Sequence, residues 1–477
     1  MALTAQEAAQ KVGELLKELG RRRPDVDKRD RYFEGEQPLA YASDEFKKFH
    51  GSRFAGWSDN WCSVVGSAAA ELTEFAAIRL GDDVTALDAE ERSLLLDWQR
   101  LDGPALQAQG LLSSAVTSRS FALVWGDRDG EPLLTWEHAS QAIVDYDPET
   151  RRAVAGLKAW RDDKREHATL YTDDEVWKFE RDLSVSTDSG LILPYSLPGG
   201  WRLRETSEPN PMRNPLGVMP LVEFGNRPVL GKGPVSDIAG TMAMQDAINL
   251  MWAYLFGAAD YASMPARVVM GQEPPKVPIL NEQGQKVGEQ TVDLEQLKKG
   301  RLLWLTGQGT TIGQWDSAKL DVFTEVIKVM VKHTASQTKT PVNYITGEMN
   351  NVNGEALTAL RLPLVMKVRD GHKHLRSPQR EVFRRIALVR GDAAVAEACR
   401  TADIGWTNPE TSSDSQTSDA ALKDKQIGWS AAGILERRYG MNQTEIDREL
   451  ARRIDEANDP LLADLLRPPV AAGVGVG

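Results

Sequence analysis

The first third of the chain has apolar residues at helical spacing. In the segment 4–19 they recur every three or four positions with polar residues between them, which predicts an amphipathic helix. The residues on its apolar face are Ala8, Val12, Leu15, Leu16 and Leu19. Pro24 predicts the start of a second, short helix, because proline fits the first turn of a helix and disrupts its interior. Helical patterns continue over 60–80 and 89–120.

The apolar period changes to two at Phe121. The alternating stretches are FALVWGDRDGEPLLTWEH, AIVDYDPETRRAVAGLKAWRD and HATLYTDDEVWKFERD, and turns rich in Gly, Asp and Pro interrupt them. We therefore expect a meander of about six short strands between residues 121 and 182. A loop-rich segment, 182–216, and an extended piece within 219–237 follow.

The second half of the chain contains several long helical patterns. Residues 237–262 predict a long helix whose apolar positions wrap more than one face, which is typical of a helix covered by several neighbours. A β-leaning insert reaches to about residue 318, and a helix returns at 320–332. After a polar loop, a long helix spans 355–389. A short helix, a polar linker at 407–418 and two or three further helices complete the pattern.

The polar loop before the long helix is rich in Asn and Gly. It lies within the stretch TKTPVNYITGEMNNVNGEALTALRLPLVMKVRDG, residues 338–371. Pro341 and the tract 347–354 leave the backbone without a repeated hydrogen-bond pattern, so we expect a mobile, solvated segment. Asn353 is a suitable N-cap for the following helix, and Pro363 predicts a kink in it. The second half of this helix is basic, which is compatible with an ordinary solvated face as well as with a functional surface.

Composition limits the classes of partner. The formal net charge of -12, from 57 basic and 69 acidic residues, disfavours tight non-specific binding to nucleic acid, which needs clustered cations. Cys62 and Cys399 lie far apart, and we expect both to be buried thiols in a reducing compartment. The apolar runs are shorter than the roughly 20 residues needed to cross a bilayer. We therefore expect a soluble, cytosolic protein.

The sequence lacks the motifs of the common enzyme and metal-binding classes. It contains no GxxxxGK[ST], HExxH or GxSxG stretch. GQGTTIG at 307–313 predicts a turn rather than a dinucleotide loop, and Asp127 and Asp129 predict a hairpin turn rather than a calcium loop. His372 and His374, two residues apart on a helix, face different sides and do not share a metal. We expect no enzymatic activity, no cofactor and no metal.

The order of the parts indicates an oligomer of the α+β class. Two long helices have a small β insert at one end and a mobile loop at the other, beside a strand-rich region and a helical C-terminal region. A monomer gains little from such a stalk. A ring of subunits gains a tube, with the insert as a collar and the loops in the bore.

Five stretches, in this order, resemble a known family. They are YFEGEQPLAYASDEF, DNWCSVVGSAAAEL, NPLGVMPLVEFGNRP, the end of the 237–262 helix with SMPARVVMG, and NGEALTALRLPLVMKVRDG. Over about residues 25–455 the sequence resembles bacteriophage portal proteins of the SPP1 type, which are found widely among phages of actinobacteria. The specificity lies in the order and spacing of the stretches, because none of them alone is a strict signature.

The resemblance implies a structural protein of the virion that forms a cyclic ring, usually of twelve subunits, at one capsid vertex. DNA would be packaged and ejected through the ring, which would dock terminase and later the head–tail connector. The implied partners are further copies of the chain, double-stranded DNA, terminase, the connector, and the major capsid and scaffold proteins, without a membrane. The implied location is the virion, and the host cytoplasm during assembly. The alternative is another virion structural protein, such as a minor head or connector component, although connectors are usually much shorter.

The resemblance also implies a portal fold, with a mixed α/β wing, a helical stem, a small β-rich clip and a helical crown. The N-terminal helices and wing would be residues 1–236, the stem helices 237–262 and 319–336, and the clip 263–318. The tunnel loop would be 337–353, and the long kinked helix with the return to the wing 354–406. The crown helices would be 407–460, and a disordered tail 461–477.

The candidate site residues follow from the same resemblance. Those of the tunnel loop are Thr340, Pro341, Asn343, Tyr344, Thr346, Gly347, Glu348, Asn350, Asn351 and Asn353. Four cations, Lys328, Lys332, Lys367 and Arg369, would attract DNA to a limited degree if they face the channel. Because sliding DNA would be slowed by strong phosphate binding, a loop made mostly of Asn, Thr and Gly suits weak, transient contact. The strand pairing within the clip does not follow from the sequence.

Overall fold

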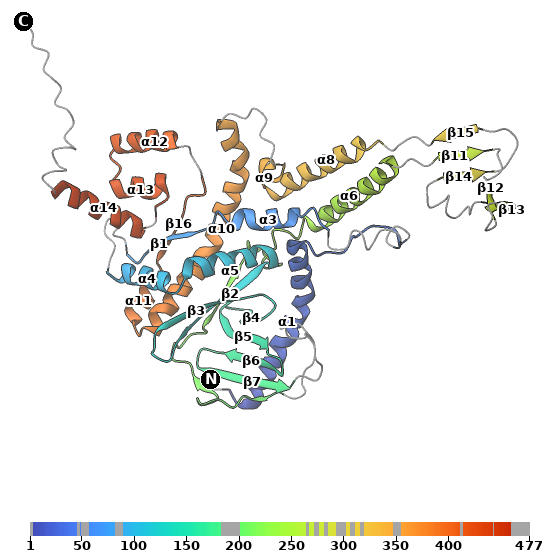
Figure 1. The fold of residues 1–477 in the computed structure, drawn as a ribbon. Helices are drawn as coiled ribbons and strands as arrows, with labels where there is room; N and C mark the ends of the chain where they lie inside the picture. The colour runs from blue at the N-terminus through green and yellow to red at the C-terminus, as the bar shows by residue number, and fades with distance from the viewer. Residues whose placement is uncertain are drawn as a thin grey trace, which may run out of the picture. The chain divides into compact units, whose positions relative to one another are not determined.

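The chain forms two compact units. The first consists of Met1–Gly35, Asn60–Met242 and Ser336–Gly477, and the second of Glu36–Asp59 and Ala243–Ala335. Figure 1 shows their helices and strands in a computed structural model. The residues that the structure describes are 3–44, 48, 57–81, 89–182, 201–263, 267–270, 276–280, 285–291, 302–305, 311–314, 319–346, 354–410, 414–441 and 443–458.

The first unit begins with the long helix α1 (Ala5–Glu34). Thr4 and Glu7 form a capping box at its N-terminus, and Gly35, with a φ of 79°, ends it in the left-handed conformation that glycine adopts easily. The apolar face expected over 4–19 is confirmed, since it packs on buried side chains of the neighbouring sheet that include Leu157 and Leu170.

Pro24 lies inside α1, so the prediction that a second helix starts there is wrong. The proline is exposed, while Leu19 before it and Val26 after it are buried in the first unit. Apolar contacts on both sides of Pro24 therefore hold the helix together, although the proline removes one backbone hydrogen bond.

Two antiparallel sheets form the centre of the first unit. One has the order β10–β2–β3, from β2 (Arg119–Gly126), β3 (Pro132–Glu137) and β10 (Leu221–Gly225). The other has the order β4–β5–β6–β7–β8, with β9 also paired to β7. Its strands are β4 (Ala142–Tyr146), β5 (Ala153–Arg161), β6 (Arg165–Tyr171), β7 (Glu175–Asp182), β8 (Arg202–Leu203) and β9 (Met212–Arg213).

The strands expected between 121 and 182 are confirmed as β2–β7, but they do not form one continuous meander. A turn at 138–141, closed by a hydrogen bond of 2.9 Å from the Gln141 amide to the His138 carbonyl, separates β3 from β4. The free edge of β2 then pairs with β10, which comes much later in the chain. In the β2–β3 turn, Asp127 accepts hydrogen bonds from the amides of Asp129 and Glu131, so the predicted turn role of these aspartates is confirmed.

Helices cover the β10–β2–β3 sheet and enclose a core cluster. The helices are α4 (Ala89–Arg100), α5 (Gly103–Thr117), α10 (Gly354–Val389) and α11 (Ala393–Ala398). The antiparallel strand pair β1 (Phe75–Arg79) and β16 (Asp403–Trp406) also contributes residues to this cluster. The rings of Phe75, Trp98 and Phe383 lie 5.0–5.7 Å apart in this cluster. Cys399 belongs to the same cluster, and it and Cys62 are buried free thiols, as expected.

The remaining helices of the first unit are short. They are α3 (Trp61–Ala70), α9 (Val342–Thr346), α12 (Asp414–Gln426), α13 (Ala431–Tyr439) and α14 (Gln443–Asn458). The helices expected near the C-terminus are thus confirmed, although α12 starts within the predicted linker. On α14, Ile446 is buried and Ile454 is 62% exposed.

The second unit contains helix α6 (Met242–Ser263), most of helix α8 (Asp321–Thr338) and a β-rich insert between them. The insert has a sheet of order β14–β11–β15 and a separate antiparallel hairpin, β12–β13. The strands are β11 (Arg267–Met270), β12 (Lys276–Leu280), β13 (Lys286–Thr291), β14 (Leu302–Leu305) and β15 (Thr311–Gln314). The β character of the insert is confirmed. Its pairing, which the sequence left open, is parallel for β11–β14 and antiparallel for β11–β15.

Candidate functional site

The structure describes only the first half of the predicted tunnel loop. Thr340 and Pro341 are buried, and the segment Val342–Thr346 forms helix α9 instead of an irregular loop. Proline favours the first turn of a helix, and the Tyr344 amide donates to the Pro341 carbonyl at 3.0 Å. The sequence tract rich in Asn and Gly begins after this helix. Its candidate residues Gly347, Glu348, Asn350, Asn351 and Asn353 lie outside the described residues.

Helix α9 is joined to α10 by an arginine–tyrosine contact. The Arg361 guanidinium carbon lies 5.4 Å from the centre of the Tyr344 ring, and the guanidinium donates a hydrogen bond to the Tyr344 hydroxyl. Stacking of guanidinium on an aromatic face adds a cation–π attraction to the hydrogen bond. Tyr344 is 36% exposed, so this contact lies at the surface of the first unit.

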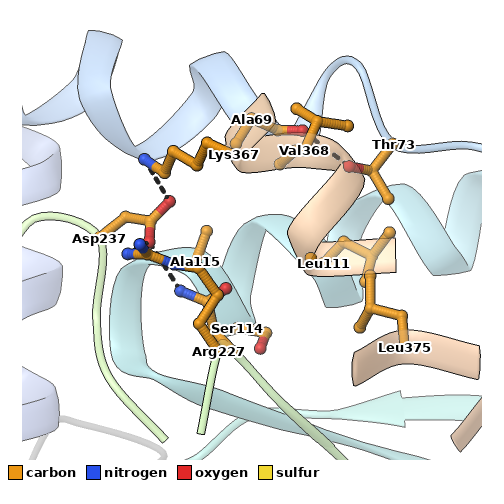
Figure 2. A pocket seen from close by; sticks show the side chains of 13 residues that line it. Ala69, Thr73, Leu111, Ser114, Ala115, Arg227, Asp237, Lys367, Val368 and Leu375 are labelled. Atoms are coloured by element: carbon orange, nitrogen blue, oxygen red, sulfur yellow. Dashed lines mark hydrogen bonds and ion pairs between the residues drawn. The ribbon is translucent and has the colours of Figure 1, made fainter. Parts of the chain in front are cut away.

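A buried charge cluster lies at the base of the loop. The Lys367 ammonium on α10 is 2.8 Å from the Asp237 carboxylate and 3.4 Å from the Thr338 carbonyl oxygen. Asp237 also accepts hydrogen bonds from Arg227 and, at 2.8 Å, from the Asn226 amide nitrogen. Figure 2 shows Lys367 and Arg227 directed at the same carboxyl group. We call Lys367, Asp237 and Arg227 the clamp.

The clamp joins segments that are distant in sequence. Asp237 precedes α6, and Thr338 is the last residue of α8. The Asp237 amide is itself fixed, since it donates to the Ala115 carbonyl on α5 at 2.8 Å. Lys367 of α10 therefore contacts, within the first unit, both the segment before α6 and the last residue of α8.

Burial determines the electrostatics of the clamp. The side chains of Lys367 and Asp237 are 4% and 2% exposed. Burial lowers the pKa of Lys367, the Asp237 carboxylate opposes that effect, and Arg227 and Lys339 add to it. Removing one partner of such a pair leaves an uncompensated buried charge, which is strongly unfavourable.

The burial of Lys367 corrects the expectation that its ammonium is a surface cation. Lys367 follows Leu364 by three residues and precedes Val368 by one, and both of these neighbours are buried in the first unit. Residues three apart lie on the same side of a helix, so the spacing from Leu364 was the signal in the sequence that Lys367 faces inward. Its carboxylate partner, Asp237, gives no such signal because it is far away in the chain.

A small cavity of about 40 Å³ lies beside the clamp. Side chains of α3, α5 and α10 line it, and Figure 2 shows Leu111, Val368 and Leu375 around it. This volume holds one or two water molecules and is too small for a cofactor. Among the described residues, no cluster of His, Cys, Asp or Glu could hold a metal ion. Nor is any helix of the described part of the chain long and apolar enough to cross a membrane.

The other predicted cations lie on exposed helix faces. Lys328 and Lys332 lie on α8, where Lys328 is 58% exposed and 3.4 Å from Glu325. Arg369 lies on α10 in the first unit, is 47% exposed and pairs with Glu410 at 2.9 Å. Lys328 and Lys332 are thus exposed on α8, Arg369 is half exposed on α10, and Lys367 is buried.

Helix α8 has three distinct faces. Ile327, Val331 and Ala335 are buried within one chain. Val322, Val326 and Val329 form a second face and are 59%, 37% and 52% exposed. The third face carries Asp321, Glu325, Lys328 and Lys332, roughly a quarter-turn from the exposed valines at 3.6 residues per turn. We call the exposed valines the valine stripe. An apolar row of this kind is unfavourable in water unless a neighbour covers it.

The chain thus has two long helices, one on each side of a β insert in the sequence, and a buried clamp at the base of the predicted loop. The sequence profile of the family described as "Phage portal protein, SPP1 Gp6-like" matches residues 14–459. The chain therefore belongs to this family of phage portal proteins, the structural proteins of the portal vertex of the capsid. No curated protein matches the chain.

Three solved structures with similar chains come from gene transfer agent (GTA) particles. One is the virion of a native GTA particle, at 12% identity and a TM-score of 0.41, covering 86% of this chain and 92% of that one. Another is the neck of a native particle computed with C12 symmetry, at 12% identity and a TM-score of 0.42, covering 84% and 94%. The third is the neck of an empty particle computed with C6 symmetry, at 13% identity and a TM-score of 0.41, covering 83% and 93%. The family assignment rests on the profile match.

Proposed function

We propose that about twelve copies of this chain close into a ring whose central channel conducts double-stranded DNA during packaging and ejection. Membership of the portal family supports a ring at the capsid vertex. The single observation that carries the proposal is the valine stripe of α8, which lies beside a separate charged face. In a ring, the stripe would be covered by the neighbouring subunit.

Covering the valine stripe would determine which face of α8 is turned to the channel. The buried face is used within one chain, and the stripe would be used between chains, so the face with Lys328 and Lys332 would remain for the bore. Glu325 lies 3.4 Å from Lys328 and reduces the net positive charge of this face. Such a surface suits DNA that must slide, because counterion release makes dense phosphate contacts tight.

The remaining parts have roles that follow from the same arrangement. The loop 337–353 would project into the channel, with its base held by the clamp. The insert 263–318 would form the clip that meets terminase and later the head–tail connector. The sheets of the first unit would form the wing that meets the capsid and scaffold proteins, and assembly would take place in the host cytoplasm. The chain would act without an enzymatic activity of its own.

Charge reversal on α8 tests the channel assignment. We expect the double substitution Lys328→Glu and Lys332→Glu to leave ring assembly intact and to change the rate of DNA translocation into procapsids by several-fold. A matched control is Lys17→Glu, on the exposed side of α1 in the first unit, where we expect no change. The measurement is packaged DNA against time in a packaging reaction with terminase.

Two results would distinguish a role of the α8 lysines in the channel from a role in the contact between subunits. Translocation at the wild-type rate in the α8 variant would show that this face is not in the channel. Loss of the ring in the α8 variant would instead place the two lysines in the contact between subunits.

A further inference from the structure

A cleft of about 730 Å³ lies in the first unit between α10, the β1–β16 pair and α13. The proposed channel and the clamp do not involve it. Its lining includes two aromatic side chains, Trp406 and Trp429, and four arginines, Arg79, Arg369, Arg437 and Arg438. This composition differs from the acidic average of the chain, which has a net charge of -12.

Two buried polar atoms of the cleft lining have no protein partner in the described part of the chain. The rings of His372 and Trp406 stack with their centres 5.0 Å apart and an angle of 15° between their planes. His372 is 9% exposed, and its Nε2 makes no hydrogen bond, as is also true of Trp406 Nε1. An indole N–H only donates, so Trp406 leaves a buried donor unsatisfied, which is unfavourable.

Other groups add positive potential to the same cleft. Ser430 caps α13 by accepting a hydrogen bond from the Gly433 amide at 3.1 Å, and both residues line the cleft. The first turn of α13, at the positive end of the helix dipole, therefore lies at the cleft, and Glu436, Arg437 and Arg438 of its last turn line the cleft as well. Arg437 stacks over Trp429, with its guanidinium carbon 4.7 Å from the ring centre, and makes no ion pair among the described residues.

Carboxylates balance part of this charge. Arg369 pairs with Glu410 at 2.9 Å, and both side chains are 47% exposed. Arg438 pairs with Asp424 at 2.6 Å, Arg79 lies 3.7 Å from Glu91, and Glu436 also lines the cleft. The Arg369–Glu410 pair is the one that a ligand could replace most easily, because exposed pairs contribute little stability.

We propose that this cleft binds a phosphate group. The indole N–H of Trp406, the guanidinium of Arg369 and the free amides of the first turn of α13 are donors suited to its oxygens, and arginine matches phosphate geometry. The ligand takes the place of Glu410 at Arg369 and supplies the acceptor that Trp406 lacks. Its source is either a DNA backbone or a smaller phosphate ester. The proposal is independent of the ring, because every group belongs to one chain.

Calorimetric titration of the full chain with pyrophosphate and with a short DNA duplex tests the proposal. We expect one pyrophosphate per chain and an affinity at least tenfold lower in Trp406→Phe, which keeps the ring stack and removes only the donor. Arg369→Gln should weaken binding similarly and is less prone to misfold, because its side chain is half exposed. The matched control is Arg21→Gln on α1, whose side chain is 74% exposed, with unchanged affinity expected.

The two ligands distinguish the sources. Competition between pyrophosphate and the duplex for the wild-type cleft would support a DNA phosphate, and binding of pyrophosphate alone would support a smaller phosphate ester. The proposal is overturned if neither ligand binds, or if either binds with the same affinity to wild type, Trp406→Phe and Arg369→Gln. Melting curves of the variants verify that each is folded.

Discussion

At the residue scale, the clamp is the feature whose removal should be most costly. Asp237→Asn leaves the Lys367 ammonium buried without its counter-charge, so we expect the free energy of unfolding to fall by about 3–5 kcal/mol. The measurement is chemical denaturation at neutral pH. Adding Lys367→Met to Asp237→Asn should restore much of the loss. The control Asp370→Asn breaks the exposed pair with Lys373 and should cost less than about 1 kcal/mol.

The pH dependence of the Asp237→Asn variant gives a second check on the clamp. Burial already lowers the pKa of Lys367, and loss of the carboxylate removes the main effect that opposes this shift. Below the lowered pKa the lysine is charged in both the folded and the unfolded chain, and the full cost is present. As pH rises from there towards the usual range of lysine, only the unfolded chain keeps the proton, so stability recovers. A deficit that does not shrink with rising pH would contradict a buried ammonium.

His372 should make the first unit sensitive to mild acid. Burial, with smaller effects of Arg376 and Arg369, lowers the pKa of His372 to about 4, whereas an unfolded histidine titrates near 6.5. Between these values only the unfolded chain binds the proton, so stability decreases as pH falls through the window. His372→Phe should flatten this part of the stability curve, measured by denaturation at several pH values. His374→Phe is the control and should keep the slope.

At the element scale, the contact of α5 with β3 depends on a glycine. A Cβ on Gly110 would come within 2.0 Å of the Trp136 ring, whose Nε1 is fixed by a hydrogen bond to Ser120. Gly110→Ala should therefore lower the free energy of unfolding by about 1–3 kcal/mol, as overpacking does. Gly371→Ala, in α10, where the added carbon meets no atom within 4 Å beyond its chain neighbours and the local helix backbone, should instead stabilise by about 0.5–1 kcal/mol. Thermal denaturation of both variants measures the difference, and equal effects would refute the packing argument.

Most elements, but not their partners, were predictable from the sequence. Alternation and turn residues located β2–β7, although β2 and β6 are buried on both faces, and periodicity located α6, α8 and α10. The split into two sheets was not predictable, since β10 is added to β2 from a distant part of the chain. The sequence predicts a helix start at Pro24 because local propensity does not include the tertiary contacts of Leu19 and Val26.

At the scale of the whole molecule, the order of five sequence stretches predicts a portal protein. The match to the portal family confirms this prediction. The clamp was not predictable, because Lys367 and Asp237 are brought together only by the folding of the first unit. The orientation of α8 in the proposed ring was likewise not predictable, because it would depend on contacts between subunits. Within one chain, the valine stripe on α8 stays exposed.

The most direct test of the proposed ring is the mass and symmetry of the purified protein. Native mass spectrometry with averaged negative-stain images, over a series of protein concentrations, should show a closed ring of about twelve copies of the 52.7 kDa chain around a central hole. Val326→Glu together with Val329→Glu should shift the population to smaller species, while Lys17→Glu should not. A wild-type chain that stays monomeric at every concentration, or a ring that the valine variant leaves unchanged, would contradict the assignment of α8 to the contact between subunits.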